Sequence, residues 1–239
     1  MQLPVRPSAV VFDMDGLLFD TETLYEAAIM AAAVEGGHKM TPVLFRRMLG
    51  GAWLNNRALL VDHFGAAFPV EAFRTAWMRH FDRMADTRLV LKPGAVELLC
   101  TLDELRLPRA IATSSSSHTV RHHLAAHGLT ERFDAIVAHG DYVFSKPAPD
   151  PYLKAAERLG VEPRLCLALE DSFNGIQSAS SAGMMVVMVP DLLEPTDGIR
   201  ALCSFVADDL HVVRGLLLAP SSAGQTVPQE PPCNGADQD

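Results

Sequence analysis

Residues 10–22 read Val10-Val11-Phe12-Asp13-Met14-Asp15-Gly16-Leu17-Leu18-Phe19-Asp20-Thr21-Glu22. An apolar run that ends abruptly at a carboxylate is typical of a short strand buried on both faces inside a parallel sheet. Such a strand would place Asp13 at its carboxyl end, the edge where open α/β sheets bind their ligands. Asp15 follows two residues later, and Gly16 permits a tight turn. The stretch therefore predicts two carboxylates in one crevice.

Two carboxylates this close repel each other unless a cation or a shared proton relieves them. Asp-x-Asp alone more often lies in a solvated turn or caps a helix, so the rest of the chain must decide. Three further apolar runs end in polar residues, at Thr113-Ser114-Ser115, Ser145-Lys146-Pro147 and Glu170-Asp171. Together the four strand ends supply a nucleophile, hydroxyl donors, a cation and metal ligands. These are the groups that phosphoryl transfer requires.

With these motifs in this order, over roughly residues 8 to 215, the sequence resembles the haloacid dehalogenase-like hydrolases. The matching elements are Asp13-Met14-Asp15-Gly16, Thr113 after an apolar run, Lys146 before a Pro, and Glu170-Asp171 before Ser172-Phe173-Asn174-Gly175. Within that family the amino-acid sequences of the motifs are most similar to those of the β-phosphoglucomutase-like branch. That branch includes sugar-phosphate phosphatases and pseudouridine-5′-phosphatase.

The resemblance implies a role for each motif residue. Asp13 would attack phosphorus and form an aspartyl-phosphate, and Asp15 would act as general acid and base. Thr113 and Ser114 would donate hydrogen bonds to the phosphate oxygens, and Lys146 would neutralise the transferring phosphoryl group.

The same resemblance implies a Mg²⁺ ion. Mg²⁺ prefers octahedral oxygen ligands, commonly one or two carboxylates together with waters and substrate phosphate. Asp13, Asp171 and the backbone carbonyl of Asp15 fit this preference. Glu170 would be either a direct ligand or a partner of the ligands.

Composition limits the classes of function. The chain has 239 residues, of which 49% are hydrophobic, so it is long enough for one large domain plus a subdomain. Its net charge of −9 gives no general attraction to nucleic acid or to anionic membranes. Residues 1–8 contain no apolar signal core, no run is long enough to span a membrane, and the four cysteines lack metal-ligand spacing. We expect a cytoplasmic protein with reduced thiols and no obligate protein partner.

The pattern of residues predicts an α/β fold, a Rossmann-like parallel sheet with helices on both faces plus a small inserted helical cap domain. Helical spacing without a strand signal predicts the cap helices Thr21–Val34, Thr41 to Leu49, Asn56–Phe64 and Val70–Arg88. From residue 92 onward strands and helices alternate, with strands Arg109–Thr113, Ala135–Ala138, Cys166–Leu169 and Met185–Val189. We expect a core at 1–20 and 90–219, a cap at 21–89 and a disordered tail at 220–239.

Two other features could bear on function. His118 and His122 lie at i, i+4, but without a third ligand they are expected on a solvated helix face. Trp53, in the loop Gly50–Leu54, is predicted to contact a substrate ring. That loop carries no basic residue, whereas a β-phosphoglucomutase uses basic residues there to hold a second phosphate, so hydrolysis is favoured unless an Arg at 46, 47 or 57 reaches the site.

The leading hypothesis is a Mg²⁺-dependent phosphatase of a small phosphorylated metabolite, either a sugar phosphate or a nucleoside monophosphate. Phosphomutase activity of the β-phosphoglucomutase type is the first alternative. A phosphoacceptor signalling domain also combines a phosphorylated Asp with an acidic pair, Thr or Ser, and Lys, but it lacks the second Asp two residues after the first. A non-catalytic binding protein on the same fold is the third alternative.

Overall fold

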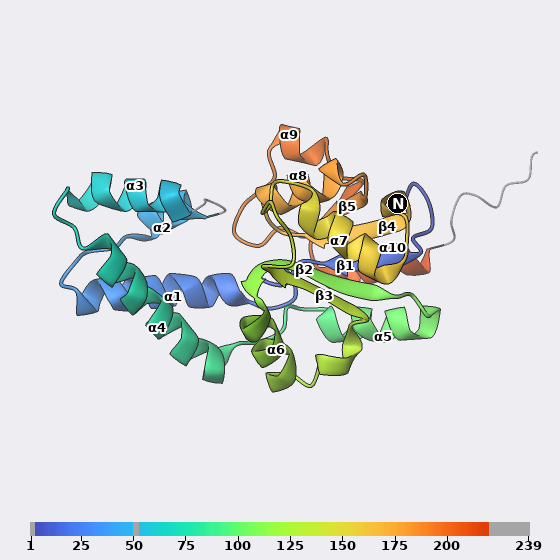
Figure 1. The fold of residues 1–239 in the computed structure, drawn as a ribbon, viewed down its shortest axis with the longest axis horizontal. Coiled ribbons are helices and arrows are strands. Elements are labelled where there is room, and N and C mark those ends of the chain that lie inside the picture. Colours follow the sequence, from blue (N-terminus) through green and yellow to red (C-terminus); the bar gives the residue numbers. More distant parts are fainter. Residues whose placement is uncertain (1–2, 50–52, 220–239) are drawn as a thin grey trace, which may run out of the picture.

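The described residues, 3–49 and 53–219 of the computed structural model, contain a six-stranded sheet in the order β3-β2-β1-β4-β5-β6 (Figure 1). All neighbouring strands are parallel, which confirms the predicted sheet. The strands are β1 (Ala9–Phe12), β2 (Arg109–Ser116), β3 (Ala135–His139), β4 (Cys166–Glu170), β5 (Met185–Met188) and β6 (Phe205–Val206). The predictions for Gly50, Gly51 and the tail 220–239 lie outside the described residues.

Strand β1 is buried on both faces, as its apolar sequence predicts. Val10 and Phe12 pack into one apolar cluster, whereas Ala9 and Val11 pack into the cluster on the opposite face. The period of two in a strand produces this division. The helices on the first face are α5 (Ala95–Leu105), α6 (Ser117–Ala126) and α10 (Leu210–Leu218). Those on the second are α7 (Asp150–Leu159), α8 (Phe173–Ser181) and α9 (Asp197–Arg200).

Four helices inserted between β1 and α5 form a lobe at one end of the molecule (Figure 1). They are α1 (Thr21–Glu35), α2 (Pro42–Met48), α3 (Trp53–Phe64) and α4 (Val70–Arg88). Their apolar side chains form a third cluster of their own, which makes the insert a helical cap. At the start of α2 the side chain of Thr41 accepts a hydrogen bond from the backbone N–H of Leu44, with Pro42 in the first turn, as the sequence predicts. The cap boundaries at 21 and 89 stay a prediction.

Strand order places the ligand crevice. The chain runs from β1 outward to β2 and β3, and then returns to the other side of β1 with β4, so the order reverses between β1 and β4. Parallel sheets bind ligands outside the carboxyl ends of the strands at such a reversal. Phe12 is the register partner of Leu169, so Asp13, which follows β1, and Glu170, the last residue of β4, are neighbours. No helix within the described ranges is long and apolar enough to cross a bilayer.

Candidate active site

Lys146 joins the carboxylates that end β1 and β4. Its ammonium Nζ donates to Asp13 Oδ1 at 2.6 Å and to Glu170 Oε1 at 2.6 Å. The Lys146 side chain is only 7% exposed, and both carboxylates are buried as well. Three residues that were predicted from separate motifs therefore form one buried ion cluster.

Glu170 is the most enclosed member of this cluster. Its Oε1 also accepts from the hydroxyl of Tyr152 at 2.8 Å. Its Oε2 accepts from the backbone N–H groups of Asp171 and Ser172 and from the Ser172 hydroxyl, each at 3.0 Å. Five donors exceed the roughly four lone-pair directions of a carboxylate. Glu170 thus orients Lys146 and the start of α8, and it could bind a metal only by releasing one of these donors.

Two glycines allow the backbone to come close to these carboxylates. In α8 the N–H of Gly175 donates to the N-cap hydroxyl of Ser172 at 3.1 Å, and a Cβ on Gly175 would lie 1.7 Å from Glu170 Oε1. Gly16 has a φ of +80°, and a Cβ there would lie 2.3 Å from Asp171 Oδ2. Any other residue at either position would displace a carboxylate of the site.

Asp15 is held by residues at the end of β2. The hydroxyl of Ser115 donates to Asp15 Oδ2 at 2.7 Å, and that of Thr113 lies 3.4 Å from the same oxygen. The backbone N–H of Ser115 also donates to Thr113 Oγ1 at 3.0 Å. Ser114, between them, is exposed and lines the cavity over the site. Sequence reasoning missed Ser115, although the period of two in a strand could have paired it with Thr113.

A cavity of about 170 Å³ opens over these groups. Its lining comprises Asp13, Asp15, Glu22, Leu49, Thr113, Ser114, Lys146, Asp171, Ser172, Leu192 and Leu193. Glu170 lies beneath this surface. Thr113, Ser114 and Lys146, which are predicted to bind phosphate, therefore face the same space as the predicted nucleophile. The carboxylate of Glu22 also lines it, and no role was predicted for this residue.

Trp53 lies elsewhere. The sequence predicts Trp53 in a loop, but in the structure it is the first residue of α3. The helix begins three residues before its predicted start at Asn56. Its ring packs against the apolar cluster of the cap, with the guanidinium carbon of Arg74 4.4 Å from the ring centroid. It is not among the described residues that line the cavity. Its contact with substrate stays a prediction.

Burial dominates the electrostatics of the site. It raises the pKa of Asp13 to about 8, with Lys146 opposing the shift and Glu170 and Asp15 adding to it. Burial also raises the pKa of Asp171 well above its ordinary value, and the charges of Glu170 and Asp13 add to this effect. For Lys146, burial lowers the pKa, but the attraction of Asp13 and Glu170 outweighs it and holds the pKa well above its ordinary value. The ammonium of Lys146 cannot by itself offset the charge of three ionised carboxyl groups, those of Asp13, Glu170 and Asp171.

The donor set fits a hard divalent cation. One carboxylate oxygen from each of Asp13, Glu170 and Asp171 lies within 4.8 Å of the other two. Carboxylate oxygens are the protein ligands that Mg²⁺ prefers, and a doubly charged ion would offset the excess of negative charge. By contrast, His118 and His122 are exposed, and the latter pairs with Asp86 at 2.9 Å, so the predicted solvated helix face is confirmed.

Comparisons with known proteins agree with this geometry. The profile of the haloacid dehalogenase-like hydrolases matches residues 7–183. Hexitol phosphatase B from Escherichia coli is 32% identical over 196 residues, which cover 80% of this chain and 86% of that protein. A Drosophila melanogaster protein named "Probable pseudouridine-5'-phosphatase" is 37% identical over 193 residues, which cover 76% and 80% of the two chains. The crystal structure of CbbY from Rhodobacter sphaeroides with phosphate superposes with a TM-score of 0.69 and 26% identity, over 85% of this chain and 95% of that chain.

Proposed function

Because this chain belongs to the haloacid dehalogenase-like hydrolase family and is a phosphatase of that family, we propose that it hydrolyses a small sugar phosphate or nucleoside monophosphate with Mg²⁺. The observation that carries the proposal is the buried cluster in which Lys146 lies 2.6 Å from both Asp13 and Glu170, beneath a cavity lined by Thr113 and Ser114. This arrangement supports the proposal, because a carboxylate, an ammonium and hydroxyl donors around one cavity are the groups that phosphoryl transfer uses.

In the proposed mechanism Asp13 attacks phosphorus through a carboxylate oxygen, and the bond from phosphorus to the leaving oxygen breaks. Asp15, oriented by Ser115, donates a proton to that oxygen so that it leaves as an alcohol. Asp15 then takes a proton from water, which attacks the aspartyl-phosphate and restores Asp13. Lys146 and the hydroxyls of Thr113 and Ser114 hold the phosphate oxygens. Mg²⁺, held by Asp13 and Asp171, would supply further positive charge for the phosphoryl group.

The charges of the cap favour hydrolysis over phosphomutase activity. Arg46 and Arg47 are exposed on α2, and the Arg57 guanidinium pairs with Glu71 at 3.3 Å. None of the three lines the cavity over the site, and residues 50–52 carry no charge in the sequence. The signalling alternative does not fit the family, and receiver domains have the strand order 2-1-3-4-5, which differs from the order found here.

A panel of phosphate monoesters tests the proposal. We expect Mg²⁺-dependent release of inorganic phosphate from at least one sugar phosphate or nucleoside monophosphate, and a complete loss of activity in EDTA that added Mg²⁺ reverses. Phosphoproteins should not be substrates, because we expect the cap to close over the site during turnover. Undiminished hydrolysis in chelator would contradict the metal assignment, and no phosphate release from any monoester would contradict the function.

Mg²⁺ should stabilise the protein more strongly as the pH rises. The pKa of Asp13 is about 8 in the folded protein against an ordinary 3.8, so the metal-free fold loses stability as the pH rises through this interval. Mg²⁺ binds the ionised carboxylates and competes with their protons. We therefore expect a larger Mg²⁺-induced increase in Tm at about pH 8 than at about pH 6, measured by scanning calorimetry.

The control for this measurement is Asp171→Asn, which removes one proposed ligand and keeps the shape of the side chain. Its Tm should respond little to Mg²⁺ at either pH. An increase in Tm that is the same at both pH values, or one that survives in Asp171→Asn, would show that the ion binds elsewhere.

A further inference from the structure

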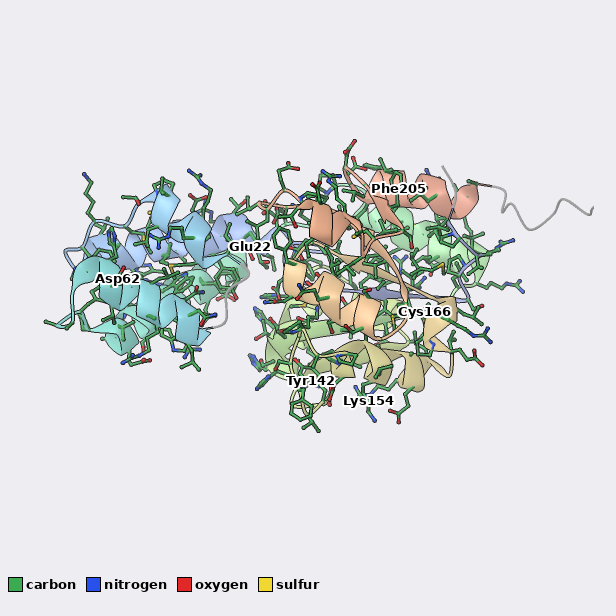
Figure 2. All side chains as sticks on the ribbon, turned by 90° about the horizontal axis from the view of Figure 1, so that it is seen from above. Glu22, Asp62, Tyr142, Lys154, Cys166 and Phe205 are labelled. Carbon is green, nitrogen blue, oxygen red and sulfur yellow. The ribbon has the colours of Figure 1, made fainter. Side chains whose placement is uncertain are left out.

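A second cavity of about 170 Å³ lies between the cap helices, next to the cavity over the site. It is lined by Glu22, Tyr25, Phe45, Met48, Leu49, Asn56 and Trp77. Glu22 and Leu49 line both cavities, so the two adjoin at these residues. Figure 2 shows Glu22 where the cap lobe meets the core, whereas Asp62 lies far out on the cap. A molecule whose phosphate lies over Asp13 would extend past Glu22 into the second cavity.

The residues that line this second cavity are held in place by contacts with one another and with Phe81. The ring of Tyr25 stacks on Phe81 with centroids 4.0 Å apart, and it meets Trp77 edge-on at 6.0 Å. The indole N–H of Trp77 donates to the carbonyl of Tyr25 at 3.2 Å. The side-chain amide of Asn56 donates to the carbonyl of Met48 at 3.0 Å. Preformed apolar walls with a few polar groups are typical of a small-molecule site.

The charge around the second cavity is negative. Among the described residues that line the two cavities, Lys146 is the only Lys or Arg. Lys92, whose charge acts on Glu22, is paired with Asp191 at 2.8 Å. Burial, with the charges of Asp15, Asp191 and Asp20, raises the pKa of Glu22 to about 7, so its carboxylate is charged above neutral pH. A second anionic group on the substrate would face this carboxylate with no cation to offset it.

We propose that the second cavity holds the leaving group of the substrate, that this group is an uncharged hydroxyl-bearing ring, and that Glu22 accepts one of its hydroxyls and repels a second phosphate or a carboxylate. The inference rests on the proposed phosphatase function and narrows its substrate class. The volume favours one ring, because sites for larger ligands measure roughly 300–1,000 Å³. The aromatic walls suit the apolar face of a sugar or a base.

The test compares two substrates with the same ring, glucose 1-phosphate and glucuronic acid 1-phosphate, in which a carboxylate replaces one CH2OH group. The assay is run at about pH 8, where Glu22 is charged. We expect kcat/KM for glucuronic acid 1-phosphate to be lower by about ten- to a hundredfold in the unmodified protein. Glu22→Gln should raise kcat/KM for glucuronic acid 1-phosphate about tenfold and raise KM for glucose 1-phosphate a few-fold, with kcat little changed. Glu26→Gln, one turn later on α1 and outside both cavities, should leave both values unchanged.

A second variant keeps the test independent of Glu22. Leu49→Lys adds a cation where the two cavities adjoin, and it should also raise kcat/KM for glucuronic acid 1-phosphate about tenfold. Uridine 5′-monophosphate, assayed alongside, distinguishes a nucleoside from a sugar as the leaving group. The inference is overturned if the unmodified protein hydrolyses the phosphates of the sugar and of the sugar acid equally well. It is also overturned if neither variant reduces the difference in kcat/KM between these two substrates. If p-nitrophenyl phosphate and every other monoester remain intact, the phosphatase function itself fails.

Discussion

Asp13→Asn should abolish turnover, with kcat reduced by at least about 10⁴-fold, because the amide has no anionic oxygen to attack phosphorus. The fold should remain intact, since Lys146 can still donate to the amide oxygen at position 13 in place of the carboxylate oxygen that it contacts at 2.6 Å. The measurement is steady-state phosphate release at saturating Mg²⁺. Asp208→Asn, at an exposed position, should retain full activity and serves as the matched control.

The same variant makes a prediction about stability with a definite sign. Burial raises the pKa of Asp13 to about 8. At neutral pH the Asp13 carboxyl of the metal-free protein must therefore either take up a proton or remain as an unfavourable buried charge. Asn removes that cost, and the Tm of the metal-free protein at about pH 8 should therefore rise or stay unchanged. A fall in Tm together with residual turnover would mean that Asp13 is a structural ion-pair partner of Lys146 and not the nucleophile.

Gly175→Ala should have the second largest effect, although Gly175 does not line the cavity over the site. The added Cβ would lie 1.7 Å from Glu170 Oε1, so α8 or the carboxylate must move. Overpacking of this kind costs about 1–3 kcal/mol. Displacement of Glu170 also releases Lys146, and a misplacement of about 1 Å in a catalytic site can lower kcat about a hundredfold. Thermal unfolding and steady-state kinetics measure the two effects.

Gly215→Ala is the matched control for this variant. Gly215 also lies in a helix, α10, but a Cβ there meets nothing within 4 Å. Ala is a better helix former than Gly by about 1 kcal/mol, so Gly215→Ala should keep full activity and raise the Tm slightly. If the two alanine variants behave alike, the close approach of α8 to Glu170 has no importance for function.

The sheet and three of the four motifs could be predicted because their strands are short, apolar and followed or ended by a polar residue. Burial on both faces removes the alternation of polar and apolar residues, so the strand ends are the clearest signal in the chain. The same logic placed Asp13 and Glu170 at one edge of the sheet, and the structure brings Lys146 to both of them. The sequence predicts a strand end at Lys146, but the apolar run Val143-Phe144 before it lies exposed in the loop that follows β3. These contacts depend on the order of the strands in the sheet. The rules for connecting parallel strands leave few possible orders.

The partners of the motif residues were harder to predict. Tyr152 donates to Glu170 from the first turn of α7, and nothing in its local sequence distinguishes it from an ordinary core tyrosine. Strand β6 has two residues, too few for a periodic pattern, and it was not predicted. The sequence predicts a loop at Trp53 because two glycines precede it, and no capping residue there indicates that α3 begins at Trp53.

The central position of β1 also affects how the chain folds. Val10 is the register partner of Arg109 in β2 and of Leu167 in β4, so β1 is synthesised first but gains its second neighbour only after about 160 residues have been added. At ribosomal speed this interval is on the order of ten seconds. Helices α1 to α4 contact one another within a short stretch of sequence and can associate early. A nascent chain that has not reached β4 would therefore carry an assembled cap beside an apolar strand with an unpaired edge, the kind of segment that chaperones bind.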